Sequence, residues 1–267
     1  GMMKRVLVLF VIMGLIGCAK KQKLSEEEAS SIAQAVVLST QNMATGATNP
    51  SNLVPSTYKG KDGVTITGDT TDADGDGVTV SGKYTFDICE TTMVGEVILK
   101  GVITHDDSLT DNDPFAWHII IGNGDYFIYK FWGMETKMKG DITASHSNST
   151  YSISLNLDYI MTFDTLTFAL SYDMTYSFTA DDVGWQPGED LTGGTLTISG
   201  QMSYSNEESH TLTISTPTPL HFTCSYTGQA QFDSGVLEIK VETGDVITIE
   251  FQSNGTYIIK LNGKVIS

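Results

Sequence analysis

Two neighbouring stretches decide the fold of this chain: Tyr151–Phe163, which reads YSISLNLDYIMTF, and Leu166–Phe178, which reads LTFALSYDMTYSF. In both, large apolar residues alternate with mostly polar ones, which is the period of a β-strand with one buried face. Only Asp164 and Thr165 lie between them. The two stretches are therefore predicted to be long strands that pair as an antiparallel hairpin.

The same alternation continues over most of the chain from about Val64 onward. Turn signals divide it into strands. Asn123-Gly124 and Asn254-Gly255 have the composition of type I′ hairpin turns, and Thr243-Gly244-Asp245 is a third signal. We predict an all-β domain of roughly a dozen strands in a single large, antiparallel and mostly meandering sheet. A β-sandwich is the alternative.

Six glycines fall inside strand-like segments, each on the apolar face of the alternation. A glycine inside a strand weakens it, so its repetition needs a reason. Without a Cβ, a sheet can bend sharply, and another element can cross that face closely. We therefore predict a strongly curved sheet, a barrel or half-barrel, with a helix against its concave face over these glycines. Coincidence is the alternative, since the chain holds 26 glycines. The six are Gly82, Gly101, Gly140, Gly200, Gly228 and Gly263.

One amphipathic helix is expected, within residues 25–44. Ser25 and Glu28 have the spacing of a capping box, in which each side chain satisfies a backbone N–H of the first turn. Apolar residues then recur at helical spacing from Ala29 to Met43. Asn49-Pro50 follows the end of this pattern, and a polar linker leads into the β domain.

The N-terminus has the layout of a bacterial export signal. Lys4 and Arg5 precede an apolar run, Val6–Ile16, that is too short to span a bilayer, which takes ~20 residues. The run ends in Leu15-Ile16-Gly17-Cys18. Here the chain resembles bacterial lipoproteins, whose lipobox reads Leu, a small or apolar residue, Gly or Ala, then Cys.

The resemblance implies cleavage after Gly17 and acylation of Cys18. Several acyl chains on one cysteine would anchor the protein stably, because each buried CH₂ contributes ~0.8 kcal/mol. In that family an Asp directly after the cysteine favours retention in the inner membrane, and Ala19 stands there instead. The resemblance therefore implies a lipid-anchored cell-envelope protein, by default at the outer membrane, on its periplasmic face or at the cell surface.

These features divide the chain into four parts. Gly1, before Met2, is taken as a cloning remnant. The expected parts are a signal peptide (1–17), a lipidated tether (18–24), an amphipathic helix with its linker (25–62) and an antiparallel β domain (63–267).

The chain is strongly acidic, with a formal net charge of −17. Without Lys4 and Arg5, 13 basic residues stand against 32 acidic ones, a net charge of −19. A field of this sign repels nucleic acid, so no nucleic-acid partner is expected. No later segment has ~20 continuous apolar residues, so we expect no transmembrane helix.

Two cysteines remain beside Cys18, namely Cys89 and Cys224. Outside the cytosol a pair of thiols tends to oxidise, so one interpretation is a disulfide between them. Both lie in strand-like apolar contexts, so two separate buried thiols are the other interpretation. Neither has a polar setting that would make a reactive thiolate.

The segment from residue 72 to residue 77, DADGDG, resembles the start of an EF-hand loop. Oxygen ligands at alternate positions with a glycine for the turn suit Ca²⁺, which makes Asp72, Asp74 and Asp76 candidate ligands. Lys83 stands where the EF-hand has its bidentate Glu, and a strand pattern follows instead of a helix. An EF-hand is therefore rejected, and either a looser Ca²⁺ site or a solvated acidic turn is left. No other cofactor is expected.

No catalytic motif stands out. The five histidines have no zinc spacing, and His105, at a strand end beside an acidic loop, is expected at the surface. The chain shows no Gly-x-Ser-x-Gly elbow, P-loop or dinucleotide fingerprint. The three tryptophans on strand segments are expected in the core, with glycan binding as the alternative; they are Trp117, Trp132 and Trp185. We therefore expect no enzyme.

Three functions stay open. The first is a non-catalytic binding or structural module that meets a protein partner in the envelope. The second is a carrier that holds a lipid or other apolar ligand in the curved sheet. The third is a hydrolase acting on envelope or extracellular glycan. The helix discriminates between the first two, because a helix that fills the concave side would leave no room for a ligand.

Overall fold

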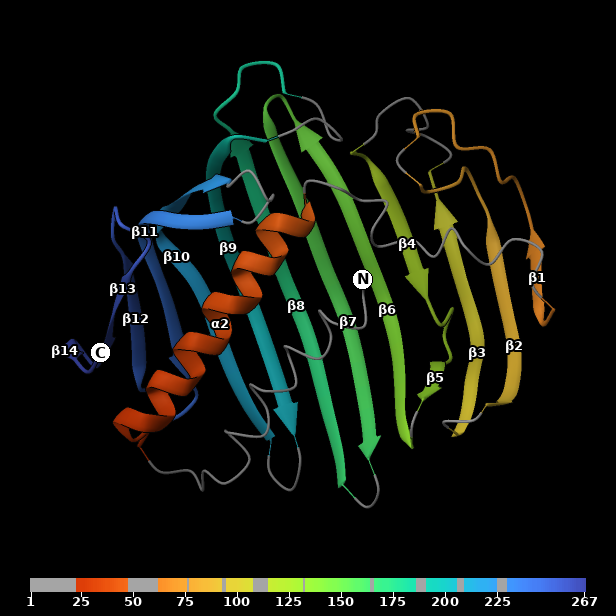
Figure 1. The fold of residues 1–267 in the computed structure, drawn as a ribbon, viewed down its shortest axis with the longest axis horizontal. Coiled ribbons are helices and arrows are strands. Elements are labelled where there is room, and N and C mark those ends of the chain that lie inside the picture. The colour runs from red at the N-terminus through yellow and green to blue at the C-terminus, as the bar shows by residue number, and fades with distance from the viewer. Residues whose placement is uncertain are drawn as a thin grey trace.

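The computed structural model describes residues 23–47, 62–75, 77–92, 95–107, 115–131, 133–163, 166–185, 191–205, 209–224 and 230–267. The fold is all-β with one helix in this part of the chain, which confirms the predicted class (Figure 1). The helix, α2, spans Glu26–Ala47. The strands are β1 (Val64–Thr67), β2 (Lys83–Thr92), β3 (Gly95–Asp106), β4 (Trp117–Ile121), β5 (Phe127–Phe131), β6 (Met134–Ser147), β7 (Thr150–Phe163), β8 (Leu166–Ala180), β9 (Gly193–Ser205), β10 (Ser209–Cys224), β11 (Ala230–Val241), β12 (Val246–Phe251), β13 (Tyr257–Leu261) and β14 (Lys264–Val265).

All strands belong to a single antiparallel sheet with β1 and β14 at its edges. Each strand pairs with its neighbours in the chain, except that β5 pairs with β3 and β6 beside β4. The predicted hairpin is confirmed, because β7 and β8 pair along their whole length up to Phe163 and Leu166. A single meandering sheet replaces the β-sandwich that was the alternative.

The Asn123-Gly124 signal produces a type I′-like turn but not a hairpin. Asn123 and Gly124 both have positive φ, 42° and 98°, and the Asp125 N–H donates to the Gly122 carbonyl at 2.9 Å. The flanking strands β4 and β5 do not pair with each other, and both pair with β3 and with β6 in the same direction. β4 and β5 therefore follow one another along the same position in the sheet, between β3 and β6. The turn that joins them bulges out of the sheet opposite Lys139 of β6.

The other two turn signals do reverse the chain. Residues 252–255 join β12 to β13, and residues 241–245 join β11 to β12. At each only the glycine has positive φ, 77° at Gly255 and 89° at Gly244. The hairpin at Asn254-Gly255 therefore has another turn type than the predicted I′, one in which a single left-handed glycine suffices.

The helix α2 begins with the predicted capping box. The Ser25 N–H donates to the Glu28 carboxylate at 2.8 Å, and the Glu28 N–H donates to the Ser25 hydroxyl at 3.2 Å. The helix continues three residues past the predicted end, through Gly46 to Ala47. No helix in the described ranges has the length and apolarity of a membrane-spanning segment.

The beginning of α2 is tied to the C-terminal turns of the sheet. The buried Asp245 carboxylate accepts hydrogen bonds from the Leu24 N–H at 2.9 Å and from the Asn262 amide at 2.8 Å. The Asn262 hydrogen bond, followed by those of Leu24 and Thr243, holds the pKa of Asp245 below its usual value. Lys264 also forms an ion pair with Glu26 at 2.6 Å. The start of the helix and the sheet are thus fastened to each other beside Leu24.

Three of the predicted glycines lie inside strands with positive φ. Gly101, Gly140 and Gly200 lie inside β3, β6 and β9, with φ of 130°, 126° and 145°, values that side chains rarely adopt. A Cβ at Gly140 would meet the Asn156 carbonyl of β7, and one at Gly200 the Asp173 carbonyl of β8. The close neighbour of Gly140 and of Gly200 is thus the next strand, and the place of the helix over these glycines stays a prediction.

The remaining glycines of the prediction have other places. Gly82 precedes β2, Gly263 lies in the turn between β13 and β14, and Gly228 falls outside the described residues. Gly235 inside β11, with a φ of 107°, was not predicted. A Cβ there would meet the Pro219 carbonyl and the Leu220 Cα of β10, where the β10–β11 register shifts.

Candidate functional site

One face of the sheet is apolar from one end to the other, and we call it the helix face because α2 lies on it. Cross-strand partners trace a single row along this face, since directly paired residues point to the same side. The row begins under α2 at the C-terminal end and reaches β3. It consists of Ile247, Ile239, Ile214, Gly200, Met174, Leu155, Ile142, Ile119 and His105.

In the centre of the sheet the helix face carries no charged residue. The alternating positions of β6, β7, β8 and β9 in the described part hold aliphatic, aromatic and methionine side chains with few polar ones. Those of them that are buried include Met138, Ile142, Ile153, Leu157, Met161, Leu170, Tyr172, Met174, Tyr176, Leu196, Ile198, Met202 and Tyr204. An uncharged, apolar face of this kind suits contact with apolar groups.

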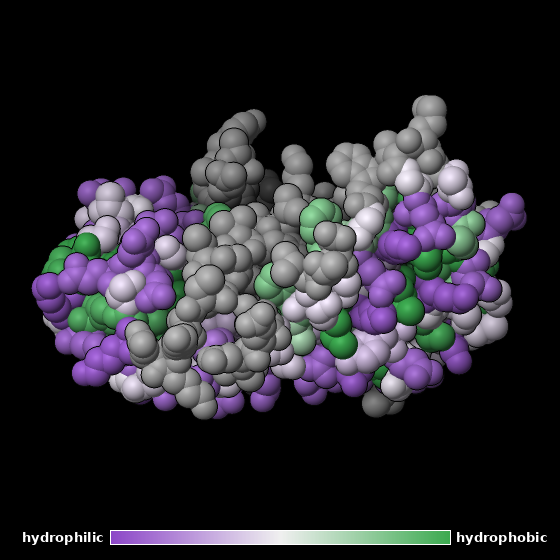
Figure 2. All heavy atoms as spheres, turned by 90° about the horizontal axis from the view of Figure 1, so that it is seen from below, coloured by the Kyte–Doolittle hydropathy of each residue, from purple (hydrophilic) through white to green (hydrophobic). Residues whose placement is uncertain are grey.

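The outer face of the same strands is polar. Hydroxyl groups pair across β7 and β8, with Ser152 and Ser177 2.7 Å apart and Ser154 and Thr175 3.2 Å apart. Lys139 and Asp158 lie on the same face, at 3.9 Å. Seen from below, the described surface mixes polar and apolar side chains, and apolar atoms reach it at both ends of the molecule (Figure 2).

Helix α2 packs on one end of the helix face. Its contacts with the sheet are concentrated on β11, β13 and β12. The helix side chains in this contact are small, with Ala29 and Ala33 at 0% exposure, so the helix lies close to the sheet. These close contacts leave out β6 and β7, although in Figure 1 the C-terminal part of α2 crosses in front of β9 and β8.

Three tyrosines lie together in that central region. Tyr159 of β7 meets the ring of Tyr172 of β8 edge-on, with centroids 5.8 Å apart. Tyr176 lies four residues further along β8, on the same face. Burial raises the pKa of Tyr159 and of Tyr176 to about 12, and it raises that of Tyr172 well above its ordinary value. All three therefore stay protonated at neutral pH and can donate a hydrogen bond.

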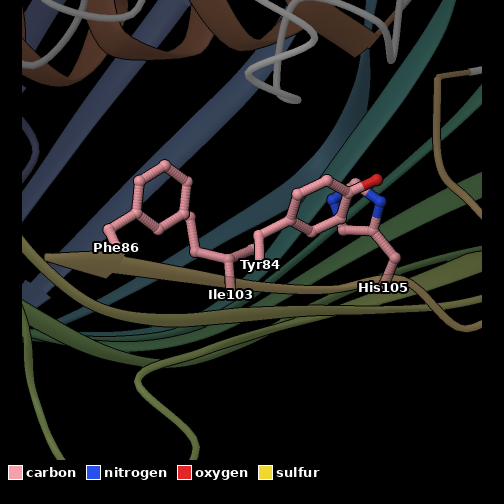
Figure 3. A pocket seen from close by; sticks show the side chains of 4 residues that line it. All are labelled: Tyr84, Phe86, Ile103 and His105. Carbon is pink, nitrogen blue, oxygen red and sulfur yellow. The ribbon is translucent and has the colours of Figure 1, made fainter. Parts of the chain in front are cut away.

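A small pocket opens at the other end of the helix face (Figure 3). Tyr84 and Phe86 of β2 and Ile103 and His105 of β3 line it. In Figure 3 the four side chains stand on the same side of the two strands, with the Tyr84 ring beside the imidazole of His105. The two ring centroids are 4.7 Å apart.

His105 is buried, with 2% exposure, which corrects the prediction that it lies at the surface. The alternation of β3 places it on the helix face, and the loop before β2 covers it. The Thr79 N–H donates to its Nδ1 at 3.2 Å, so the imidazole proton of the neutral ring sits on Nε2. Burial lowers the pKa of His105 to about 4, against a small opposing effect of Asp72. The ring is neutral at pH 7.

Two of the tryptophans are core residues, as predicted. Trp117 has 2% and Trp185 4% exposure, and Trp132 falls outside the described residues. Trp185 packs edge-on against Tyr151 at 5.2 Å and against Phe178 at 5.7 Å. This aromatic group closes one margin of the helix face, so neither of these two tryptophans offers an exposed ring to a glycan.

A carboxylate–imidazole–carboxylate cluster that no sequence pattern predicted lies on the outer face. His221 of β10 lies between Asp233 of β11, at 2.8 Å from Nδ1, and Asp181 after β8, at 2.9 Å from Nε2. Burial alone would lower the pKa of His221, but the hydrogen bonds and charges of Asp233 and Asp181 outweigh it and raise the pKa. The three residues are far apart in the chain and meet only because β10 shifts register against β11.

The candidate calcium residues lie in the loop between β1 and β2. Both carboxylate oxygens of Asp72 accept backbone N–H groups, from Gly75 at 2.9 Å and from Gly77 at 3.2 Å. Asp74 is half-buried, and Asp76 falls outside the described residues. In the described part of the chain no three His, Cys, Asp or Glu side chains are grouped to hold a metal. Calcium binding stays a prediction.

The two cysteines are free thiols in the structure, Cys89 exposed on β2 and Cys224 half-buried at the end of β10. Six strands lie between β2 and β10 in the sheet order, so the disulfide interpretation does not describe this structure. Cys89 is not buried as the alternative expected, because its side chain points to the outer face of β2. Burial raises the pKa of the Cys224 thiol. Cys18, the predicted lipidation site, falls outside the described residues.

Comparison with known proteins adds no relative. No protein-family model matches the chain, and no curated protein and no solved structure is similar to it.

Proposed function

We propose that this chain is a lipid-anchored protein of the bacterial cell envelope that holds an apolar ligand, a lipid, on the helix face of its sheet. The anchor is the acylated Cys18 that the lipobox-like segment Leu15–Cys18 predicts. Ala19 after it favours an outer-membrane address. The role is binding, not catalysis.

One observation carries the ligand part of the proposal. The helix face has no charged residue in the described positions of β6 to β9, and the contacts of α2 are concentrated on β11 to β13. A helix over the centre of the sheet would have favoured a structural or protein-binding module. The main contacts of α2 lie away from β6 and β7, and this supports the carrier.

The anchored corner supports the same proposal. Leu24 is fixed by Asp245, and only residues 19–23 separate it from Cys18. Five residues span at most about 18 Å when fully extended. An acylated Cys18 would therefore keep the sheet close to a membrane surface, from which a lipid could enter.

The ligand test is native mass spectrometry of the full chain purified from a bacterial envelope in mild detergent. We expect adducts with the masses of lipids that survive removal of the detergent. Leu155→Lys, which places a charge on the helix face, should abolish them. Asn156→Lys, on the outer face of the same strand, is the matched control and should retain them. Equal adducts on both variants would argue against this ligand site.

The anchor is tested separately by expressing the full chain and its Cys18→Ser variant in the same host. We expect the wild type in the membrane fraction, with the mass of an acylated N-terminus at Cys18. The variant should lack the acyl mass. An unmodified wild-type chain with an intact leader in the cytosol would disprove the anchor.

A further inference from the structure

Two buried polar groups of the helix face have no hydrogen-bond partner within the described ranges. They are the hydroxyl of Tyr172 on β8 and the indole N–H of Trp117 on β4. The two residues have 9% and 2% exposure. An unsatisfied buried donor costs about 1–3 kcal/mol, so such groups are rare in native proteins and call for an explanation.

The two donors are too far apart for one ligand group to satisfy both. β4 and β8 are three strand positions apart in the sheet order, which is roughly 14 Å at normal strand spacing. Tyr172 is the one that lies in the uncharged centre of the helix face. Its direct cross-strand partners are Leu157 and Met202.

The surroundings of Tyr172 determine which polar group could accept a hydrogen bond from its hydroxyl. Among the described residues, Tyr159 and Tyr176 are the ionisable groups that affect its pKa besides burial, and burial keeps all three tyrosines protonated. No lysine or arginine lies on the described helix face of β6 to β9. A carboxylate or phosphate placed there would lose its hydration without a cation in exchange, which costs several kcal/mol. A neutral carbonyl oxygen would lose little hydration free energy there and would accept the hydrogen bond from the hydroxyl.

We propose that Tyr172 donates a hydrogen bond to the ester carbonyl of a neutral acyl ester, a glyceride-like lipid, whose hydrocarbon chain lies on the helix face. This rests on the proposed apolar-ligand function and names its ligand class. The neighbouring methionines, Met174 and Met202, suit a flexible chain, since methionine adapts to irregular apolar surfaces.

The test compares three ligands of equal chain length, namely palmitoylglycerol, palmitate at alkaline pH and hexadecane. Their binding to the full chain and to its Tyr172→Phe variant is measured by calorimetry in the same detergent. We expect the wild type to prefer palmitoylglycerol over palmitate. Tyr172→Phe should lower the affinity for palmitoylglycerol about fivefold to tenfold and leave hexadecane unchanged. Tyr84→Phe, which removes a hydroxyl from the far end of the same face, is the control and should change neither.

Thermal unfolding without ligand gives a second readout. Because the Tyr172 hydroxyl has no partner in the structure, Tyr172→Phe should leave the Tm unchanged or raise it. A fall in Tm would show that the hydroxyl is already satisfied within the protein and would overturn the assignment.

The binding results distinguish the ester assignment from the apolar-ligand function on which it rests. Hexadecane binding with an unchanged palmitoylglycerol affinity in Tyr172→Phe overturns the ester assignment alone, as does tighter binding of palmitate than of palmitoylglycerol. Failure of all three ligands to bind overturns the apolar-ligand function and this proposal with it.

Discussion

At the C-terminal end of the sheet, α2 lies against β11, β12 and β13, and the apolar side chains between them, such as Leu237 and Ile249, have 0% exposure. At the N-terminal end the same alternation of β3 and β5 meets no helix in the described part of the chain. Leu99 and Tyr129 there are half-buried, and a pocket opens beside His105. The two ends share a sequence pattern and differ in what covers it. The alternation of a strand therefore predicts which face is apolar, whereas the covering element determines whether that face becomes core or remains able to bind.

The largest expected difference between the two ends is in the free energy of unfolding that is lost when a leucine is shortened to alanine at each end. Leu237→Ala should lower the free energy of unfolding by about 3–5 kcal/mol, because it leaves a cavity between α2 and the sheet. Leu99→Ala should cost only about 1 kcal/mol, because its side chain is half in solvent already. Urea unfolding of both variants measures the two values. Equal losses would show that the ends are equally well packed.

A glycine between the two ends, Gly200 of β9, gives the next largest effect. Gly200→Ala should cost about 3 kcal/mol, because a Cβ would collide with the Asp173 carbonyl and lie 2.7 Å from the Met174 Cα, at a φ of 145°. Gly244→Ala is the matched control, with a φ of 89° and no atom within 4 Å of the added Cβ. It should cost about 1 kcal/mol, from backbone strain alone. Similar losses from both would mean that the close approach of β8 does not matter.

Sequence patterns predicted those structural features that depend on residues close together in the chain. The capping box of Ser25 and Glu28, and the β7–β8 hairpin around residues 164–165, follow from spacing within a few positions. The burial of His105 does not, because it depends on a loop that returns from residue 79. The His221 cluster depends on a register shift in β10, and the orphan hydroxyl of Tyr172 on what its neighbours leave unsatisfied. Those are properties of the assembled sheet.

The same limit explains the turn at Asn123-Gly124. Two residues with positive φ were predicted there and are present, but a hairpin did not follow. Both β4 and β5 find β3 and β6 on either side, and those partners continue the strand across the turn. A turn signal thus fixes the local backbone, while the pairing of its flanks depends on distant strands.

His105, at the N-terminal end, should make the protein less stable in acid. Its pKa of about 4 in the folded state lies below the ordinary value of 6.5, so the unfolded chain binds the proton first. The stabilisation from the neutral ring is complete above pH 6.5 and is lost as the pH falls towards 4. At pH 5 the loss should be about 2 kcal/mol relative to pH 7. His105→Gln, which can still accept the Thr79 N–H, should lack this loss in urea unfolding at the two pH values. A loss of the same size in the variant would assign the acid sensitivity to other groups.

His221, towards the C-terminal end, should act in the opposite direction and more weakly. Its pKa in the folded state is raised, because Asp233 and Asp181 together outweigh the effect of burial. The stabilisation is therefore complete below its ordinary value of 6.5 and is lost as the pH rises through the raised pKa. The imidazole is about one-third exposed, so screening by solvent should keep the effect below about 1 kcal/mol. His221→Gln should remove the decline in stability on the alkaline side and leave the acid decline due to His105 intact. If His221→Gln changed the acid side instead, the two carboxylates would not be holding a charged ring, and the two ends of the sheet would not respond to pH in opposite senses.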